Sequence, residues 1–135
     1  MVTSITLNHD RLVRDVMQKD VFTVKFDTPL VDTIKELKSK NVSGLVVVDN
    51  IGEFVGVVSA LDVFKAVDEA DRIDKLFAED VMTPFTITVS LDESIADSAK
   101  TMIEENIHRL IVTESPTNKK PIGIITSTDL INNIL

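Results

Sequence analysis

The sequence has no cysteine, a shortage of basic residues and no long apolar run. Without cysteine, disulfides, thiolate catalysis, iron–sulfur clusters and zinc ribbons are excluded. The 14 basic residues are outnumbered by 22 acidic ones, and the formal net charge of −8 gives no basic surface for nucleic acid or anionic lipid. The longest aliphatic run, residues 45–48, is far shorter than the roughly 20 residues that span a bilayer. Charged residues are frequent at positions 9–15, where a signal peptide would need an apolar run, so we expect a cytoplasmic protein. From the net charge and the short apolar runs we expect no nucleic-acid or membrane partner.

The most informative feature that is present is an internal repeat. The 135 residues, 44% apolar and 27% charged, suffice for one globular domain or two small units that share a core. Asp-Val-Met at residues 15–17 returns at residues 80–82, which is 65 positions later. Residues 56–62 and 123–129, 67 positions apart, share a second pattern: glycine, two aliphatic residues, a hydroxyl residue, two further residues and aspartate. The chain is therefore a tandem repeat with a two-residue insertion in its second copy.

Each copy has the pattern of a strand, a helix, two strands and a second helix. Apolar residues at i, i+4 and i+7 predict amphipathic helices around residues 30–37 and 95–102. The short, β-branched runs 45–48 and 55–58 are typical of strands buried on both faces. Pro29 is expected at the first helical position, with Thr28 as the N-cap, and Asp92 or Ser94 is expected to cap the corresponding helix of the second copy.

These elements predict an α/β fold of two repeats. We expect repeat 1 over residues 10–68, a helical linker over residues 69–79 and repeat 2 over residues 80–135. Each repeat should have a three-stranded sheet and two helices. A unit of this size buries too little surface to be stable alone, so the two should pack about a pseudo-twofold axis.

Side chains for catalysis or metal binding are scarce. The only two histidines are His9, in a polar stretch before the first repeat, and His108, which has no other histidine near it in sequence. No zinc-hydrolase spacing is present. Carboxylates are abundant, but an acidic surface would have them too, so acid–base pairs cannot be selected. We expect no catalytic residue, no metal site and no enzymatic activity.

The repeated glycine–hydroxyl–aspartate pattern is the stronger candidate for binding. It joins a strand to the beginning of a helix, where free backbone N–H groups point outward. A carboxylate there can accept two hydrogen bonds from a vicinal diol, which is how ribose is recognised. The alternative is structural: Ser59 or Thr126 would be an ordinary N-cap, and Asp62 or Asp129 an ordinary first-turn acid.

A cationic pair distinguishes the second copy from the first. His108 and Arg109 replace Ser43 and Gly44 at the equivalent positions. The guanidinium offers a planar fork of donors suited to phosphate. An exposed surface pair at the start of a strand explains the same residues equally well.

These motifs together resemble a tandem pair of cystathionine β-synthase (CBS) domains, the Bateman module, over essentially the whole chain from residue 13. Residues 107–112 are also similar to a segment of the γ subunit of AMP-activated protein kinase, in which a His-Arg pair meets nucleotide phosphate. The resemblance implies binding of an adenosine nucleotide, with AMP, ADP, ATP and S-adenosylmethionine as candidates. It also implies association into a flat homodimer and no covalent cofactor.

The resemblance further implies two unequal sites in clefts that combine both repeats. The first and favoured site would use Ser59 and Asp62 for ribose, Thr86, Ile87 and Ile107 around the base, and His108 and Arg109 for phosphate. The second would use Thr126, Thr128 and Asp129 for ribose and phosphate, with Val21, Phe22, Val42 and Ser43 around the base.

Two hypotheses of different classes follow from these sites. In the first, the chain is a regulatory, energy-sensing module that binds adenosine nucleotide and signals to a separate effector protein. In the second, it is a dimeric scaffold whose nucleotide clefts are vestigial. A phosphate-transferring enzyme is a third possibility, for which we expect no turnover.

Overall fold

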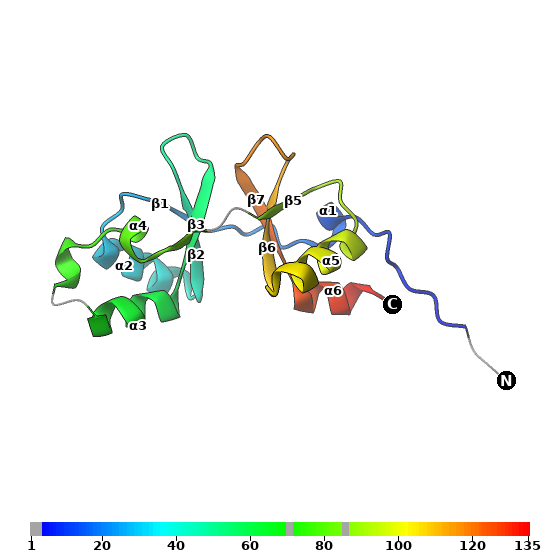
Figure 1. The fold of residues 1–135 in the computed structure, drawn as a ribbon, viewed down its shortest axis with the longest axis horizontal. Helices are drawn as coiled ribbons and strands as arrows, with labels where there is room; N and C mark the ends of the chain where they lie inside the picture. The colour runs from blue at the N-terminus through cyan, green and yellow to red at the C-terminus, as the bar shows by residue number, and fades with distance from the viewer. Residues whose placement is uncertain (1–3, 70–71, 85–86) are drawn as a thin grey trace. The chain divides into compact units, whose positions relative to one another are not determined.

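The predicted order of strands and helices is confirmed in both repeats (Figure 1). The computed structural model describes residues 4–69, 72–84 and 87–135. The first repeat has β1 (Thr23–Lys25), α2 (Leu30–Lys40), β2 (Gly44–Val48), β3 (Phe54–Ser59) and α3 (Ala60–Glu69). The second has β5 (Thr88–Ser90), α5 (Ile95–Glu105), β6 (Arg109–Thr113), β7 (Pro121–Thr126) and α6 (Ser127–Asn133). The short elements before and between them are α1 (Val13–Val16), the 3₁₀ turn η1 (Ile73–Lys75), α4 (Ala78–Val81) and β4 (Thr83–Pro84).

The chain forms two compact units, which we call the first unit, residues 21–86, and the second unit, residues 1–20 together with residues 87–135. This division differs from the repeats in one respect. The Asp-Val-Met segment at residues 15–17 lies in the unit that contains the second repeat, whereas residues 80–82 lie with the first repeat. Each unit is thus completed by the segment that precedes the other repeat.

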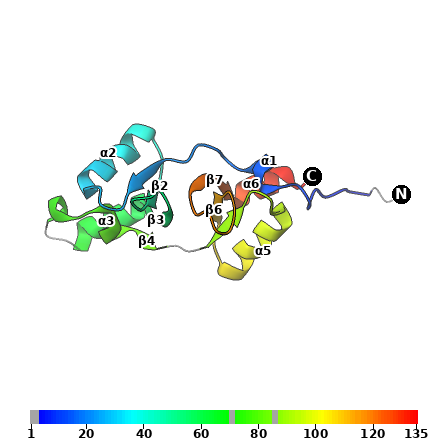
Figure 2. The same ribbon diagram turned by 90° about the horizontal axis from the view of Figure 1, so that it is seen from above.

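The sheets of the two units have the same topology. In the first unit the order is β1-β2-β3-β4, with β1 parallel to β2 and the other pairs antiparallel. In the second unit the order is β5-β6-β7, and Gln18 forms an isolated antiparallel bridge with Ile124 where the first unit has β4. The main helices of each unit cover one face of its sheet (Figure 1, Figure 2).

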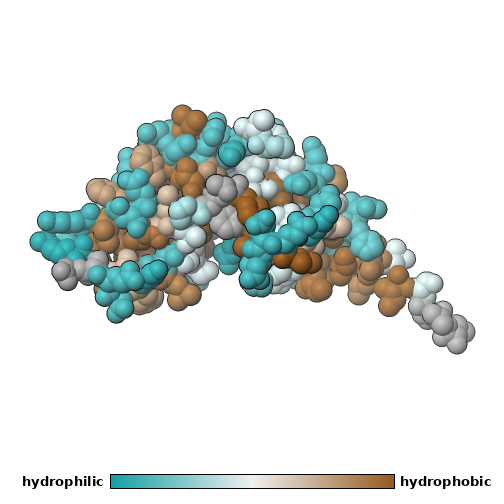
Figure 3. Space-filling view, in the orientation of Figure 1, coloured by the Kyte–Doolittle hydropathy of each residue, from teal (hydrophilic) through white to brown (hydrophobic). Residues whose placement is uncertain are grey.

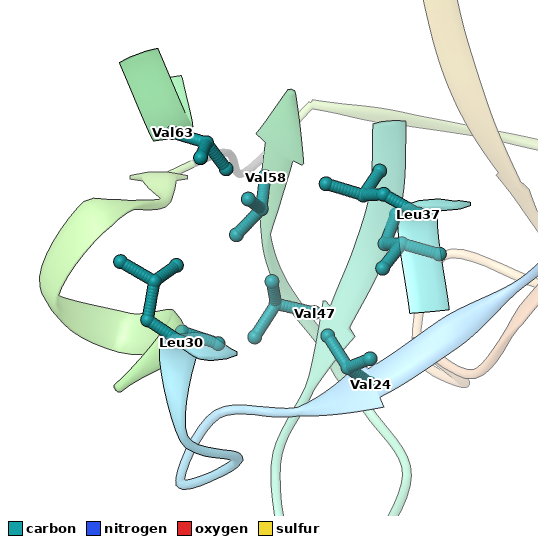
Figure 4. Packing of buried hydrophobic residues seen from close by; sticks show 8 residues of the cluster. Val24, Leu30, Leu37, Val47, Val58 and Val63 are labelled. Atoms are coloured by element: carbon teal, nitrogen blue, oxygen red, sulfur yellow. The ribbon is translucent and has the colours of Figure 1, made fainter. Parts of the chain in front are cut away.

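Each unit has its own apolar core between sheet and helices. In the first unit, Leu30 and Leu37 of α2 and Val63 of α3 point toward Val47 and Val58 of the sheet (Figure 4). In the second, the core contains the fully buried residues Val13, Ile95, Leu110, Val112 and Ile125. The prediction that residues 45–48 are buried on both faces is also confirmed, because all four are buried. The same prediction for residues 55–58 is wrong, because Val55 and Val57 are only half-buried.

The helix ends agree only in part with the sequence-based prediction. Pro29 is itself the N-cap of α2, with extended backbone, so the prediction of Thr28 as cap is wrong. Ser94 caps α5 by accepting a hydrogen bond from the Asp97 backbone N–H at 3.1 Å. Asn41 and Asn106 end α2 and α5 with φ of 53°, in the left-handed conformation that asparagine tolerates.

The linker predicted over residues 69–79 is helical only in places. Glu69 ends α3, residues 70–71 lie outside the described chain, and a 3₁₀ turn and the start of α4 follow. Between them Leu76 and Phe77 have extended backbone, and the Leu76 carbonyl accepts a hydrogen bond from the Leu30 backbone N–H at 2.8 Å. The segment therefore packs against the beginning of α2. None of the helices formed by the described residues has both the length and the hydropathy of a membrane-spanning segment.

Candidate functional site

The first aspartate of the repeated pattern lies at the beginning of α3, where it is held by Ser59. Oδ2 of Asp62 accepts hydrogen bonds from the Ser59 backbone N–H at 2.8 Å and from the Ser59 hydroxyl at 2.9 Å. In return, the Asp62 backbone N–H donates to Ser59 Oγ at 3.2 Å. The helix cap considered for these residues is therefore real. The cap engages Oδ2 of Asp62, and Oδ1 takes no part in it.

A third residue, Thr83 of β4, meets the other carboxylate oxygen. Its hydroxyl lies 3.3 Å from Oδ1 of Asp62. Asp62 and Thr83 also line a hollow of about 410 Å³ in the first unit, together with Lys65 of α3 and Pro84. The carboxylate is thus half-buried at the edge of a space that a ligand group can enter.

The second aspartate has the same arrangement at the beginning of α6. Oδ2 of Asp129 accepts from the Thr126 backbone N–H at 2.9 Å and from the Thr126 hydroxyl at 3.0 Å, and the Asp129 backbone N–H donates to Thr126 Oγ1 at 3.2 Å. Here the third residue is Gln18, whose Nε2 lies 3.3 Å from Oδ1 and 3.2 Å from Oδ2. Gln18 and Thr83 occupy equivalent repeat positions.

The glycines of the pattern are required by close packing inside each unit. A Cβ at Gly56 would lie 2.8 Å from the Met82 Sδ and 2.8 Å from the Thr83 carbonyl oxygen. A Cβ at Gly123 would lie 2.6 Å from the Met17 Sδ and 3.0 Å from the Gln18 carbonyl oxygen. Each glycine is therefore in close contact with the methionine of an Asp-Val-Met segment and with the residue after it. This packing positions Thr83 and Gln18 beside the two aspartates.

The cationic pair lies in the second unit, next to the cap of α6. Arg109 is exposed, begins β6 and pairs with Thr126 of β7 in the antiparallel register. The His108 carbonyl accepts a hydrogen bond from the Ser127 backbone N–H at 2.9 Å. His108 itself is exposed and lines a hollow of about 420 Å³ formed by residues of α5 and α6.

The other predicted contact residues fall into three groups. Ile87 and Ile107 pack at the margin of the second unit's core, and Phe22 and Val42 at the margin of the first. Val21 is half-buried, whereas Ser43 and Thr128 are exposed. Thr86 lies outside the described residues.

The two caps were predicted from the sequence, whereas Thr83 and Gln18 were not. A usable signal existed, because in each copy a polar residue directly follows the methionine of Asp-Val-Met. Among the described residues, no group of three or more His, Asp or Glu side chains could hold a metal ion.

Comparison with known proteins identifies the same two copies. The family model described as the CBS domain matches residues 13–69 and again residues 78–135. An uncharacterised protein of Methanocaldococcus jannaschii is 38% identical over 122 residues, which cover 90% of this chain and 39% of that protein. The chain spans between 29% and 60% of the length of four curated relatives that it matches.

Solved structures of CBS domain proteins have the same fold. The CBS domain pair of protein MJ0100, in complex with 5′-methylthioadenosine and S-adenosyl-L-methionine, matches with a TM-score of 0.74 and 28% identity over 91% of this chain and 94% of that one. CBSX2 in complex with AMP matches with a TM-score of 0.72 and 30% identity over 90% of this chain and 94% of that one.

Proposed function

The chain belongs to the CBS domain family, and from this premise we propose that it is a non-enzymatic regulatory module that binds an adenosine nucleotide and signals to a separate effector protein. The observation that supports this most directly is the Asp62 carboxylate at the edge of a hollow, with Oδ2 engaged by Ser59 and Oδ1 beside the Thr83 hydroxyl.

Ribose binding by this carboxylate follows from its hydrogen-bonding capacity. An ionised carboxylate has about four lone-pair sites and can accept both hydroxyls of a vicinal diol. The cap fixes the carboxylate in one orientation, which lowers the entropy lost when a diol binds. The Thr83 hydroxyl adds a group that can both donate and accept.

The proposed contacts of the favoured site are Ser59 and Asp62 for ribose, Thr86, Ile87 and Ile107 for the base, and His108 and Arg109 for phosphate. For the second site they are Thr126, Thr128 and Asp129, with Val21, Phe22, Val42 and Ser43 for the base. Arg109 supports the phosphate assignment because the residue is exposed and forms no salt bridge with any described residue. A charge-assisted hydrogen bond from it to phosphate is about twice as strong as a neutral one.

The candidate ligands are AMP, ADP, ATP and S-adenosylmethionine. Two related proteins support this class, since one was solved with 5′-methylthioadenosine and S-adenosylmethionine and another with AMP. All of these contain adenosine, so the proposed ribose contact with Asp62 is common to them.

The test is thermal unfolding in the presence of each candidate ligand. At a concentration 100 times its dissociation constant, a ligand stabilises the folded chain by about 2.7 kcal/mol. We expect one or more of the four to raise the Tm, and Asp62→Ala to reduce the rise. Asp97→Ala is the matched control, because Asp97 is also a first-turn acid next to a serine cap but belongs to α5. A Tm that none of the four ligands changes at millimolar concentration would contradict the proposal.

A specific observation also favours the second function, a dimeric scaffold. Phe64 of α3 and Ile131 of α6 occupy equivalent repeat positions and are 69% and 70% exposed, and Leu61 is 80% exposed. Figure 3 shows hydrophobic residues gathered over α6, toward the C-terminus. Exposed apolar residues at matching positions of two helices are typical of a self-association surface.

Sedimentation equilibrium of the wild type and Phe64→Ser tests this second function. We expect a dimer that becomes monomeric in the variant. If Arg109→Ala leaves both nucleotide affinity and the response of an effector unchanged while the dimer persists, the scaffold is the better description.

A further inference from the structure

The two proposed ribose-binding aspartates differ in the third residue that contacts each carboxylate. We infer that Gln18 closes the Asp129 carboxylate to ribose, so that the chain binds one nucleotide tightly through Asp62 and a second only weakly through Asp129. This inference rests on the proposed function, because it takes both aspartates as ribose-binding groups.

The caps of the two aspartates are equivalent and cannot cause the difference. Ser59 and Thr126 contact Oδ2 of their aspartates at distances that agree within 0.1 Å, at 2.8 and 2.9 Å for Ser59 and 2.9 and 3.0 Å for Thr126. Thr83 contacts only Oδ1 of Asp62, at 3.3 Å. Gln18 is close to both oxygens of Asp129, at 3.3 and 3.2 Å.

The position of the Gln18 amide is the one that a diol would need. A nitrogen almost equidistant from both carboxylate oxygens lies in front of the carboxylate, where two ribose hydroxyls would donate. The amide nitrogen can only donate, so it competes with those hydroxyls and offers them no acceptor. The Thr83 hydroxyl, in contrast, leaves Oδ2 alone and can accept from a ligand hydroxyl by rotating its own proton.

Oδ2 of Asp129 also accepts more hydrogen bonds than Oδ2 of Asp62, which supports the same conclusion. Oδ2 of Asp129 accepts from the Thr126 backbone, the Thr126 hydroxyl and Gln18, whereas Oδ2 of Asp62 accepts only from the backbone and hydroxyl of Ser59 in the described chain. A ribose at Asp129 must therefore displace Gln18 first. At the lower end of its usual range, a hydrogen bond to a charged group corresponds to about a tenfold change in affinity.

The backbone holds Gln18 in place. Its N–H donates to the Ile124 carbonyl at 2.8 Å and its carbonyl accepts from the Ile124 N–H at 2.9 Å. The amide group can leave Asp129 only by a change of side-chain rotamer. A substitution at this position therefore changes the contact with Asp129 and leaves the strand pairing intact.

The repeat provides a reciprocal experiment. Isothermal titration with AMP, ADP, ATP and S-adenosylmethionine, each in a separate experiment, is carried out on the wild-type chain of 135 residues and on Gln18→Thr and Thr83→Gln. We expect one tight equivalent per wild-type chain, which Asp62→Ala removes. Gln18→Thr should strengthen the second site about tenfold, an effect that Asp129→Ala should cancel. Thr83→Gln should weaken the first site about tenfold.

Two results would overturn the inference and leave the proposed function standing: two equally tight equivalents in the wild type, or AMP binding through Asp62 that neither exchange alters. Binding of none of the four probes by any variant would instead reject the proposed function. A ligand-free measurement tests the contact itself, because the Gln18 side-chain amide resonance should shift in Asp129→Ala. An unshifted resonance would also overturn the inference.

Discussion

At the scale of single residues, Gly56 and Gly123 leave no room for a side chain. A Cβ at Gly56 would meet both a methionine sulfur and a backbone oxygen at 2.8 Å, and only the sulfur belongs to a flexible side chain. We expect Gly56→Ala to lower the free energy of unfolding by about 2 kcal/mol, as overpacking of a core does. Urea unfolding measures this. The double variant with Met82→Ala should recover only part of the loss, and full recovery would contradict the role of the Thr83 carbonyl.

Two hydroxyl residues at equivalent positions of α2 and α5 should respond in opposite directions. Thr33 and Ser98 are both fully buried, but only Thr33 donates a hydrogen bond, to the Pro29 carbonyl at 3.1 Å. The Ser98 hydroxyl is the one buried side-chain polar atom without a hydrogen-bond partner in the described chain. We expect Ser98→Ala to stabilise the protein by about 1 kcal/mol and Thr33→Val to destabilise it by a similar amount. Equal losses in urea unfolding would contradict this account.

At the scale of elements, α3 and α5 both begin at a serine cap, but only the cap of α3 is also proposed to bind a ligand. Ser59 and Ser94 each accept a hydrogen bond from the backbone three residues later, at 3.2 and 3.1 Å. We expect Ser59→Ala and Ser94→Ala each to cost about 1 kcal/mol of stability. Only Ser59→Ala should also weaken AMP binding, since it frees the Asp62 carboxylate to move. Equal AMP affinity in the two variants would show that Ser59 is a cap alone.

The helices and strands were the most predictable part of the fold because apolar spacing determines which face each buries. The spacing of Leu30, Ile34 and Leu37 was sufficient to predict α2, and the run 45–48 to predict β2. The N-cap of α2 was less predictable. A proline can occupy either the cap or the first helical position, and that choice depends on contacts with residues 76–78, which are far away in sequence.

At the scale of the whole molecule, residues 1–20 are expected to be indispensable for the second unit. They supply the fully buried Val13 and the two backbone hydrogen bonds between Gln18 and Ile124. Without them, amide hydrogens of β6 and β7 should exchange more rapidly than those of β2 and β3. Removal of residues 1–6 alone, of which residues 4–6 are exposed, is the control. Unchanged protection of β7 in the longer truncation would contradict the division into units.

That division is also what the sequence could not reveal. The two Asp-Val-Met segments have the same sequence, and the residues around the two glycines are of the same types. From sequence alone, either segment could therefore pack against either glycine. Local patterns cannot choose between equivalent partners; the choice depends on chain connectivity and long-range packing. The carboxylates of the candidate site were found because they recur, whereas Thr83 and Gln18 differ in type and were missed for that reason.

The pairing of residues 1–20 with residues 87–135 also sets an order of events during synthesis. The contact partners within residues 21–86 are all present once this stretch has left the ribosome, so these contacts can form before residues 87–135 are made. Val13 and Met17, made earlier, must wait until β7 has emerged. Val13 and Met17, although translated before residues 21–86, are therefore among the last residues to reach their native partners.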